Sequence, residues 1–118
     1  MVATILIVDP DPANRSLLEV LALRLGHRPI GQRELSEGEC PDLMLLEPAS
    51  RAGMKLAARL RRWLPQLPIL CVSIDPPNWE TAELGVNGHV MKPFRRSQLE
   101  RALESALIPA ADGREARV

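Results

Sequence analysis

The sequence lacks most of the features that mark specialised classes of protein. It holds only two cysteines, Cys40 and Cys71, and two histidines in unrelated contexts, which do not form a zinc-binding pattern. Cys71 lies in an apolar run and is expected to be a buried small hydrophobe, and no disulfide is expected in a cytosolic protein. No apolar run approaches about 20 residues, so no membrane-spanning helix is predicted.

An excess of charge of one sign is also missing. The 15 basic and 15 acidic residues balance, so the totals do not favour binding of nucleic acid or of an anionic membrane, and no helix-turn-helix pattern is present. The N-terminus enters a strand-like run at once, without the charged region and cleavage site of a signal peptide, so a cytoplasmic location is predicted. There is no Gly-rich phosphate loop, and the chain is not expected to be an enzyme.

What the sequence does have is an alternation of short apolar runs and helical patterns in one domain-sized chain of 118 residues. The predicted strands are residues 5–8, a weak strand at 29–30, and 43–46, 69–73 and 89–91. The predicted helices are residues 12–25, 52–64, a short helix at 79–84 and a helix from 97, with at most one or two turns within 33–41. The alternation predicts an α/β fold with a parallel sheet and helices on both faces. The domain is expected over residues 1–108, and a disordered tail or the start of a linker over 109–118.

Local signals define the ends and faces of these helices. Asp11 is a good N-cap, and Pro12 suits the first helical position. Ser97 and Glu100 have the spacing of a capping box for the last helix. The leucines expected on the buried face of the first helix are Leu17, Leu18, Leu21 and Leu25.

Polar side chains follow the predicted strands where each one ends. Asp9 and Asp11 follow the first strand, Glu47 follows the third, Ser73 ends the fourth and Lys92 follows the fifth. In open α/β sheets, ligands bind at the carboxyl ends of the strands, beside a switch point in the strand order. Three carboxylates, a hydroxyl and an ammonium are therefore expected to converge in one crevice.

Four stretches of the chain resemble the response-regulator receiver domain of two-component signalling, a CheY-like family, over about residues 4–107. They are ILIVD at 5–9, PDLMLL at 41–46, PILCVS at 68–73 and GVNGHVMKPF at 85–94, of which the last is the most specific. The resemblance implies a flavodoxin-like, doubly wound five-stranded sheet of order 2-1-3-4-5. The chain departs from the family in length: the segment between the first helix and the third strand is too short for a full strand and helix, so the helix between the second and third strands is expected to be short or missing.

The resemblance implies a role for each residue at the strand ends. In the family, an aspartate at the Glu47 position accepts a phosphoryl group from a histidine kinase, and two acids at the Asp9 and Pro10 positions hold Mg²⁺. A hydroxyl and a lysine, here Ser73 and Lys92, contact the phosphoryl group. An aromatic residue on the fifth strand moves inward on activation.

Three positions depart from the family. The phosphoacceptor position is Glu47, whose extra methylene moves the nucleophilic oxygen by about 1.5 Å. The second acid is Pro10, which offers no side-chain oxygen to a metal, and the switch aromatic is His89. No metal site is therefore predicted; weak Mg²⁺ binding would rest on Asp9 and Glu47, with Asp11 as a substitute ligand.

The predicted function is an atypical receiver-like signalling module, a pseudo-receiver that is not phosphorylated and binds a protein partner. In this interpretation Glu47 pairs with Lys92 and holds the domain in one state. One alternative is a Mg²⁺-dependent phosphoacceptor with relaxed site chemistry. Another is the N-terminal regulatory domain of a longer transcriptional regulator.

The candidate interaction surface consists of Trp79, His89, Arg95 and Arg96. A further partner hypothesis is a homodimer, formed through the helix at 79–84, the strand at 89–91 and the last helix. Trp79 could equally be a core residue. The helix at 52–64 carries many cations, which are expected to face solvent. The alternative is that they contact an acidic partner. These cations are Arg51, Lys55, Arg59, Arg61 and Arg62.

Overall fold

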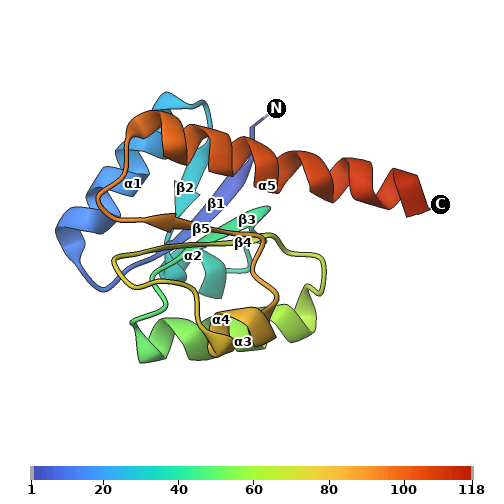
Figure 1. Ribbon diagram of the computed structural model, residues 1–118, viewed down its shortest axis with the longest axis horizontal. Helices are drawn as coiled ribbons and strands as arrows, with labels where there is room; N and C mark the ends of the chain where they lie inside the picture. The colour runs from blue at the N-terminus through green and yellow to red at the C-terminus, as the bar shows by residue number, and fades with distance from the viewer. Residues whose placement is uncertain (1, 118) are drawn as a thin grey trace.

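The computed structural model describes residues 2–117, and it describes side chains for residues 2–107. Five parallel strands form one sheet in the order β2-β1-β3-β4-β5, as predicted (Figure 1). The strands are β1 Thr4–Val8, β2 Arg28–Ile30, β3 Leu43–Leu46, β4 Ile69–Ser73 and β5 Gly88–Met91. The helices are α1 Pro12–Arg24, α2 Gln32–Ser36, α3 Arg51–Trp63, α4 Trp79–Leu84 and α5 Arg96–Arg117. None of the described helices is long and apolar enough to cross a membrane.

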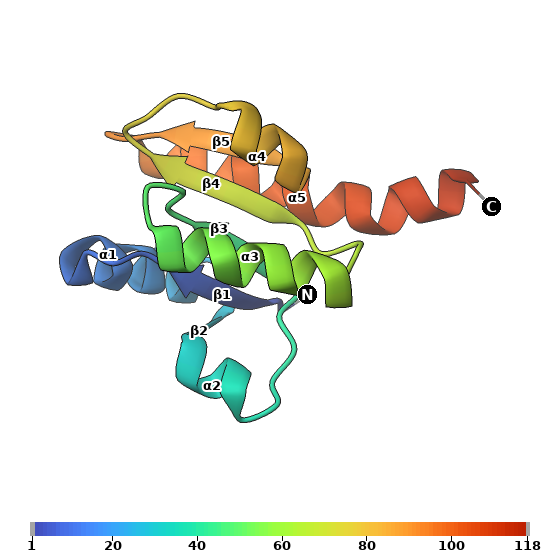
Figure 2. The same cartoon turned by 90° about the horizontal axis from the view of Figure 1, so that it is seen from below.

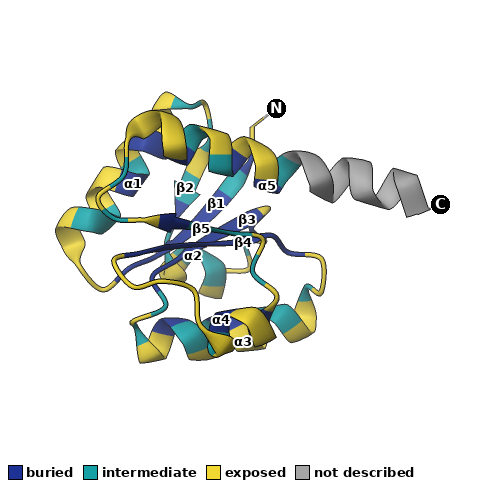
Figure 3. Ribbon diagram, in the orientation of Figure 1, coloured by how far each residue is buried: buried dark blue, intermediate teal, exposed yellow. Residues whose placement is uncertain are grey.

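Helices cover both faces of the sheet, because the strands are apolar on both sides. α1 and α5 lie on one face and α3 and α4 on the other (Figures 1 and 2). Along β1, Ile5 and Ile7 point to the first helical layer, and Leu6 and Val8 point to the second. All four side chains are buried, as Figure 3 shows for the central strands. The continuous apolar runs of the sequence thus follow from burial on both sides of a parallel sheet.

Most helix boundaries agree with the sequence signals. The Asp11 side chain accepts the backbone N–H of Ala13 at 2.9 Å and caps α1. The short α4 begins at Asn78, which accepts the N–H of Thr81 at 3.0 Å, and ends at Gly85. Gly85 has a φ of 73°, a left-handed conformation that favours glycine. α2 is short, as expected.

Two local predictions are wrong. Leu17 is 49% exposed, because the buried stripe of α1 runs through Leu18 and Leu21 instead. The Ser97–Glu100 capping box does not form, because α5 begins one residue earlier, at Arg96. The side chain of Gln98 instead accepts the backbone N–H of Arg95 at 2.6 Å. α5 continues to Arg117, through most of the segment 109–118 that was predicted as a tail or linker, and the side chains of that segment lie outside the described residues.

Candidate functional site

The sheet register brings the strand-end residues together. Val8 of β1 pairs with Leu46 of β3, so the next residues along, Asp9 and Glu47, leave adjacent strands side by side. Ser73 ends the neighbouring β4. Asp9 is 5% exposed, Glu47 9% and Ser73 0%, so the polar cluster lies at the floor of the crevice. This is the convergence that the sequence predicts.

Lys92 joins the two carboxylates of this cluster. Its Nζ donates to Oδ2 of Asp9 at 3.0 Å and to Oε1 of Glu47 at 3.1 Å. The three side chains are 14%, 2% and 10% exposed, for Lys92, Asp9 and Glu47 respectively. We call these three residues the acid–lysine cluster. It holds one cation between two anions in a site with little water.

Both oxygens of the Glu47 carboxylate are engaged. Oε1 accepts from Lys92, and Oε2 accepts the backbone N–H of Ala49 at 3.0 Å. Burial acts to raise the pKa of Glu47, but the Ala49 N–H, the Ser73 hydroxyl and Lys92 outweigh it and hold that pKa below its usual value. Burial likewise acts to lower the pKa of Lys92, and the two carboxylates outweigh it and raise that pKa. Glu47 and Lys92 are therefore both charged at neutral pH.

The acidic side chains next to this cluster are also occupied. The second oxygen of Asp9, Oδ1, accepts the backbone N–H of Asp11 at 2.9 Å. The Asp11 carboxylate accepts from Ala13 N–H and from the side-chain amide of Asn14, which fixes it as a helix cap. Pro10 between them is exposed and has no side-chain donor atom.

These contacts do not suit Mg²⁺. The ion prefers several oxygen ligands in octahedral geometry, usually including carboxylates. Among the described residues, no group of three or more His, Cys, Asp and Glu side chains could hold a metal ion. The two buried carboxylates already share the Lys92 ammonium, which offsets part of the negative charge that would attract a divalent cation.

His89, at the switch-aromatic position, is half-buried on β5. Its Nε2 lies 2.8 Å from the backbone oxygen of Asp75, in the loop that follows β4. A carbonyl oxygen only accepts, so Nε2 is the donor in this contact. Nδ1 is buried without a partner among the described residues. The ring thus ties β5 to the β4–α4 loop.

The candidate interaction residues lie on different elements: Trp79 begins α4, His89 lies on β5, and Arg95 and Arg96 lie next to or at the start of α5. Trp79 is 70% exposed, so the prediction that it might fill the core is wrong. It lines a groove between α3 and α4, whereas Arg95 lines a separate pocket with Phe94 at the start of α5. Arg96 is exposed and pairs with Glu100 at 2.9 Å.

Sequence reasoning missed the role of Arg61, which was grouped with the solvated cations of its helix. Its Nε donates to Leu84 O at 2.9 Å and its Nη2 to Gly85 O at 3.2 Å, at the end of α4. Its Nη1 donates to Pro65 O at 2.9 Å and Leu67 O at 2.7 Å. One guanidinium therefore holds the end of α4 and the α3–β4 loop together. Only the fold brings these four carbonyls within its reach.

Comparison with known proteins supports the receiver assignment. No family model matches the chain. It is 31% identical to the positive alginate biosynthesis regulatory protein of Pseudomonas aeruginosa, over 117 aligned residues that cover 89% of this chain and 47% of that protein. The chain thus spans about half the length of this curated relative.

Solved structures share the fold. NtrX from Brucella abortus in complex with ADP superposes with a TM-score of 0.86 at 22% identity, over 99% of this chain and 29% of that one. The receiver domain of the sensor histidine kinase PA1611 from Pseudomonas aeruginosa, which has a magnesium ion in its active-site cleft, gives 0.77 at 22% identity, over 91% and 98%. The chain therefore has the fold of the response-regulator receiver domains, as its four sequence stretches predict. At the strand ends this chain carries Glu47 and Pro10.

Proposed function

We propose that the chain is a receiver-like signalling module of the cytoplasm that works without phosphorylation, by binding a protein partner and without catalysing a reaction. The observation that carries this proposal is the Lys92 ammonium, bound at 3.0 and 3.1 Å between Asp9 and Glu47. Receiver domains act in signalling through protein partners, so loss of the phosphorylation step leaves binding as the function.

Glu47 is a poor nucleophile in this setting. Both oxygens of Glu47 accept hydrogen bonds, from Lys92 and from the Ala49 N–H, and these stabilise the charged carboxylate and make it less nucleophilic. Its extra methylene also displaces the carboxylate by about 1.5 Å, and a misplacement of about 1 Å can cost on the order of a hundredfold in rate. Without a carboxylate at Pro10, metal stabilisation of the transferring group is weakened as well.

The test is the intact mass of the protein after incubation with acetyl phosphate and Mg²⁺. The native chain is compared with the double variant Pro10→Asp, Glu47→Asp, which supplies the missing ligand and the shorter nucleophile. A matched control, Pro10→Asp with Glu47→Gln, supplies the ligand without a nucleophile. We expect only the first variant to gain a phosphoryl group.

Two other outcomes count against the proposal. Phosphorylation of the native chain would show that Glu47 or Asp11 performs the chemistry, and would favour the relaxed phosphoacceptor. If neither the native chain nor the folded double variant is phosphorylated, Pro10 and Glu47 are not what prevents the reaction.

A further inference from the structure

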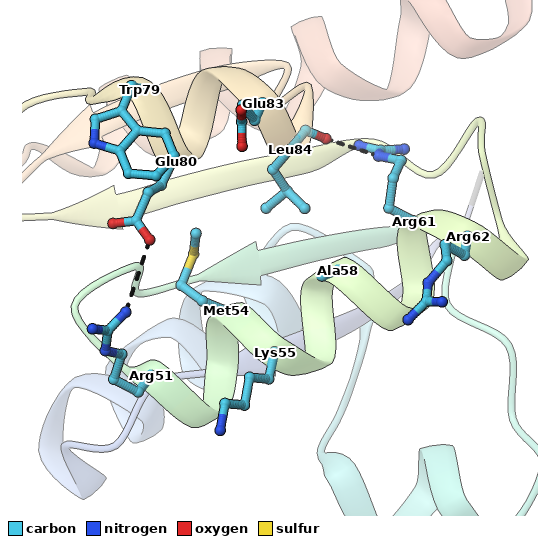
Figure 4. A pocket seen from close by; sticks show the side chains of 10 residues that line it. All are labelled: Arg51, Met54, Lys55, Ala58, Arg61, Arg62, Trp79, Glu80, Glu83 and Leu84. Carbon is cyan, nitrogen blue, oxygen red and sulfur yellow. Dashed lines mark hydrogen bonds and ion pairs between the residues drawn. The ribbon is translucent and has the colours of Figure 1, made fainter.

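A groove of about 820 Å³ lies between α3 and α4, on the face of the sheet away from α1 and α5 (Figure 4). Met54 and Ala58 of α3 and Leu84 of α4 give it an apolar lining. Trp79 stands at the rim with 70% of its surface exposed. The acid–lysine cluster takes no part in it, so the groove is separate from the strand-end site.

Side chains of α3 contact α4 at both ends of the groove. Arg61 binds the backbone oxygens of Leu84 and Gly85 at the end of α4. At the other end, Arg51 of α3 faces Glu80 of α4 at 3.8 Å. Because the Arg61 hydrogen bonds fix α4 relative to α3, little ordering is needed before something binds between them.

The two walls carry opposite charge. α3 has no acidic residue, and its exposed Lys55 and Arg62 line the groove. The α4 wall presents the exposed Glu83. None of these three side chains forms an ion pair with another residue in the described part of the chain. Figure 4 shows Lys55 and Glu83 at a similar place along the groove, on opposite walls.

We propose that this groove is a docking surface for a second copy of the chain. A two-fold axis along the groove places the α3 wall of each copy over the α4 wall of the other, so that Lys55 of each faces Glu83 of its partner. The same surface then serves on both subunits, as a two-fold interface requires. The balanced net charge of the chain adds no long-range repulsion between copies.

The charge pattern favours a second copy over an occupant of one sign. A purely acidic segment meets Glu83, and a purely basic segment meets Lys55 and Arg62. Burial of Trp79 and Met54 supplies the attraction, because large apolar side chains dominate interface energetics. The exposed charges set the orientation and contribute little to affinity.

The first experiment is sedimentation velocity of the native chain at rising concentration, up to about 1 mM, a range that captures even weak association. We expect a reversible dimer. Trp79→Ala is expected to weaken it by about tenfold, as for an interface anchor. Trp63→Ala is the matched control: Trp63 is 84% exposed and does not line the groove, and its loss is expected to leave the dimer intact.

A charge exchange then tests the arrangement. Lys55→Glu and Glu83→Lys each place like charges opposite one another, and each variant alone is expected to dimerise less than the native chain. In an equimolar mixture, the heterodimer brings the two substituted positions together in one contact and keeps Lys55 against Glu83 in the other. Opposite charges then face one another in both contacts, and the dimer is expected to recover. A dimer through α4, β5 and α5 excludes α3, so it is insensitive to Lys55→Glu.

Three results overturn the inference. A native chain that stays monomeric over the whole concentration range would show that the groove binds a different protein and not a second copy. A dimer weakened equally by both tryptophan variants does not use the groove, and a mixture that fails to recover the dimer excludes the two-fold pairing. The inference does not depend on the proposed function, because the three results are interpreted in the same way whether or not the native chain is phosphorylated.

Discussion

At the scale of single residues, Lys92 sets the charge balance at the carboxyl ends of the strands. Two carboxylates that are almost fully buried repel one another, and the ammonium between them offsets that repulsion. A buried ion pair gains little over apolar side chains of the same shape, but removal of one partner leaves an uncompensated charge. The intact cluster therefore adds little to total stability, whereas loss of Lys92 alone is costly.

Replacement of Lys92 by methionine tests this view. Lys92→Met keeps most of the side-chain volume and leaves Asp9 and Glu47 without their shared cation. We expect the free energy of unfolding, measured in urea at neutral pH, to fall by about 3–5 kcal/mol. Arg96→Met, which breaks only the exposed pair with Glu100, is expected to change it by less than about 0.5 kcal/mol. Equal losses in the two variants would contradict the role of the cluster.

The pKa of Glu47 predicts how stability depends on pH. Because burial is outweighed by its hydrogen bonds and by Lys92, the folded-state pKa lies below the ordinary value of 4.5. Glu47 therefore stabilises the native state above about pH 4.5 and loses that contribution as pH falls through its lowered pKa. Urea unfolding of the native chain and of Glu47→Gln is expected to give a difference that shrinks on acidification below this value. A difference that grows would show that the pKa is raised instead.

At the scale of elements, α4 is too short to be stable by itself. An isolated helix of six residues does not form in water, so α4 depends on its caps and on tertiary contacts. Asn78 caps its start, and Arg61 binds the oxygens of Leu84 and Gly85 at its end. One side chain of α3 thus holds a second helix in place.

Arg61→Met should release this contact. We expect the free energy of unfolding to fall by about 2–3 kcal/mol, because charged hydrogen bonds to backbone oxygens are lost. The amides of α4 should also exchange with solvent faster than in the native chain, as hydrogen exchange with mass spectrometry would show. Arg62→Met, at the exposed next position, is the matched control and should alter neither quantity. If both variants behave alike, the Arg61 contacts do not stabilise α4.

At the scale of the whole molecule, the fold was largely predictable from the sequence. The apolar runs identify the strands, and burial on both faces follows from their lack of alternation. The strand-end site was predictable too, because a parallel sheet gathers Asp9, Glu47 and Lys92 at one edge whatever the details of packing. The buried face of α1 and the contacts of Arg61 were not predictable, because they depend on the angles and distances between elements and not on the pattern of residue types.

The misses have a common physical cause. Leu17 and Leu18 are neighbours of the same type, and only the rotation of α1 against the sheet buries one of them and exposes the other. Arg61 and Arg62 are likewise alike in sequence, and only Arg61 meets the end of α4. The sequence is equally compatible with a core and a surface position for Trp79, and only the position of α4 distinguishes them.

The exposure of both tryptophans leads to a prediction for the unfolding of the whole domain. Trp63 and Trp79 are 84% and 70% exposed, so their surroundings change little when the monomer unfolds at low concentration. Tryptophan emission is expected to shift only slightly, while circular dichroism follows one cooperative transition. Phe94→Trp places an indole against the core and should report that transition by fluorescence. A large shift in the native chain would contradict the exposed positions.

The pairing of Glu47 with Lys92, next to Pro10, has an evolutionary consequence under the proposed function. Glu47→Asp alone leaves a proline at the second position after β1. Pro10→Asp alone adds a third carboxylate beside Glu47, which is still bound by Lys92. On that proposal neither substitution creates a phosphoacceptor by itself, so selection for one would have to favour both together. The two positions are then epistatic, and a sequence that carries both residues is slow to acquire a phosphorylation switch.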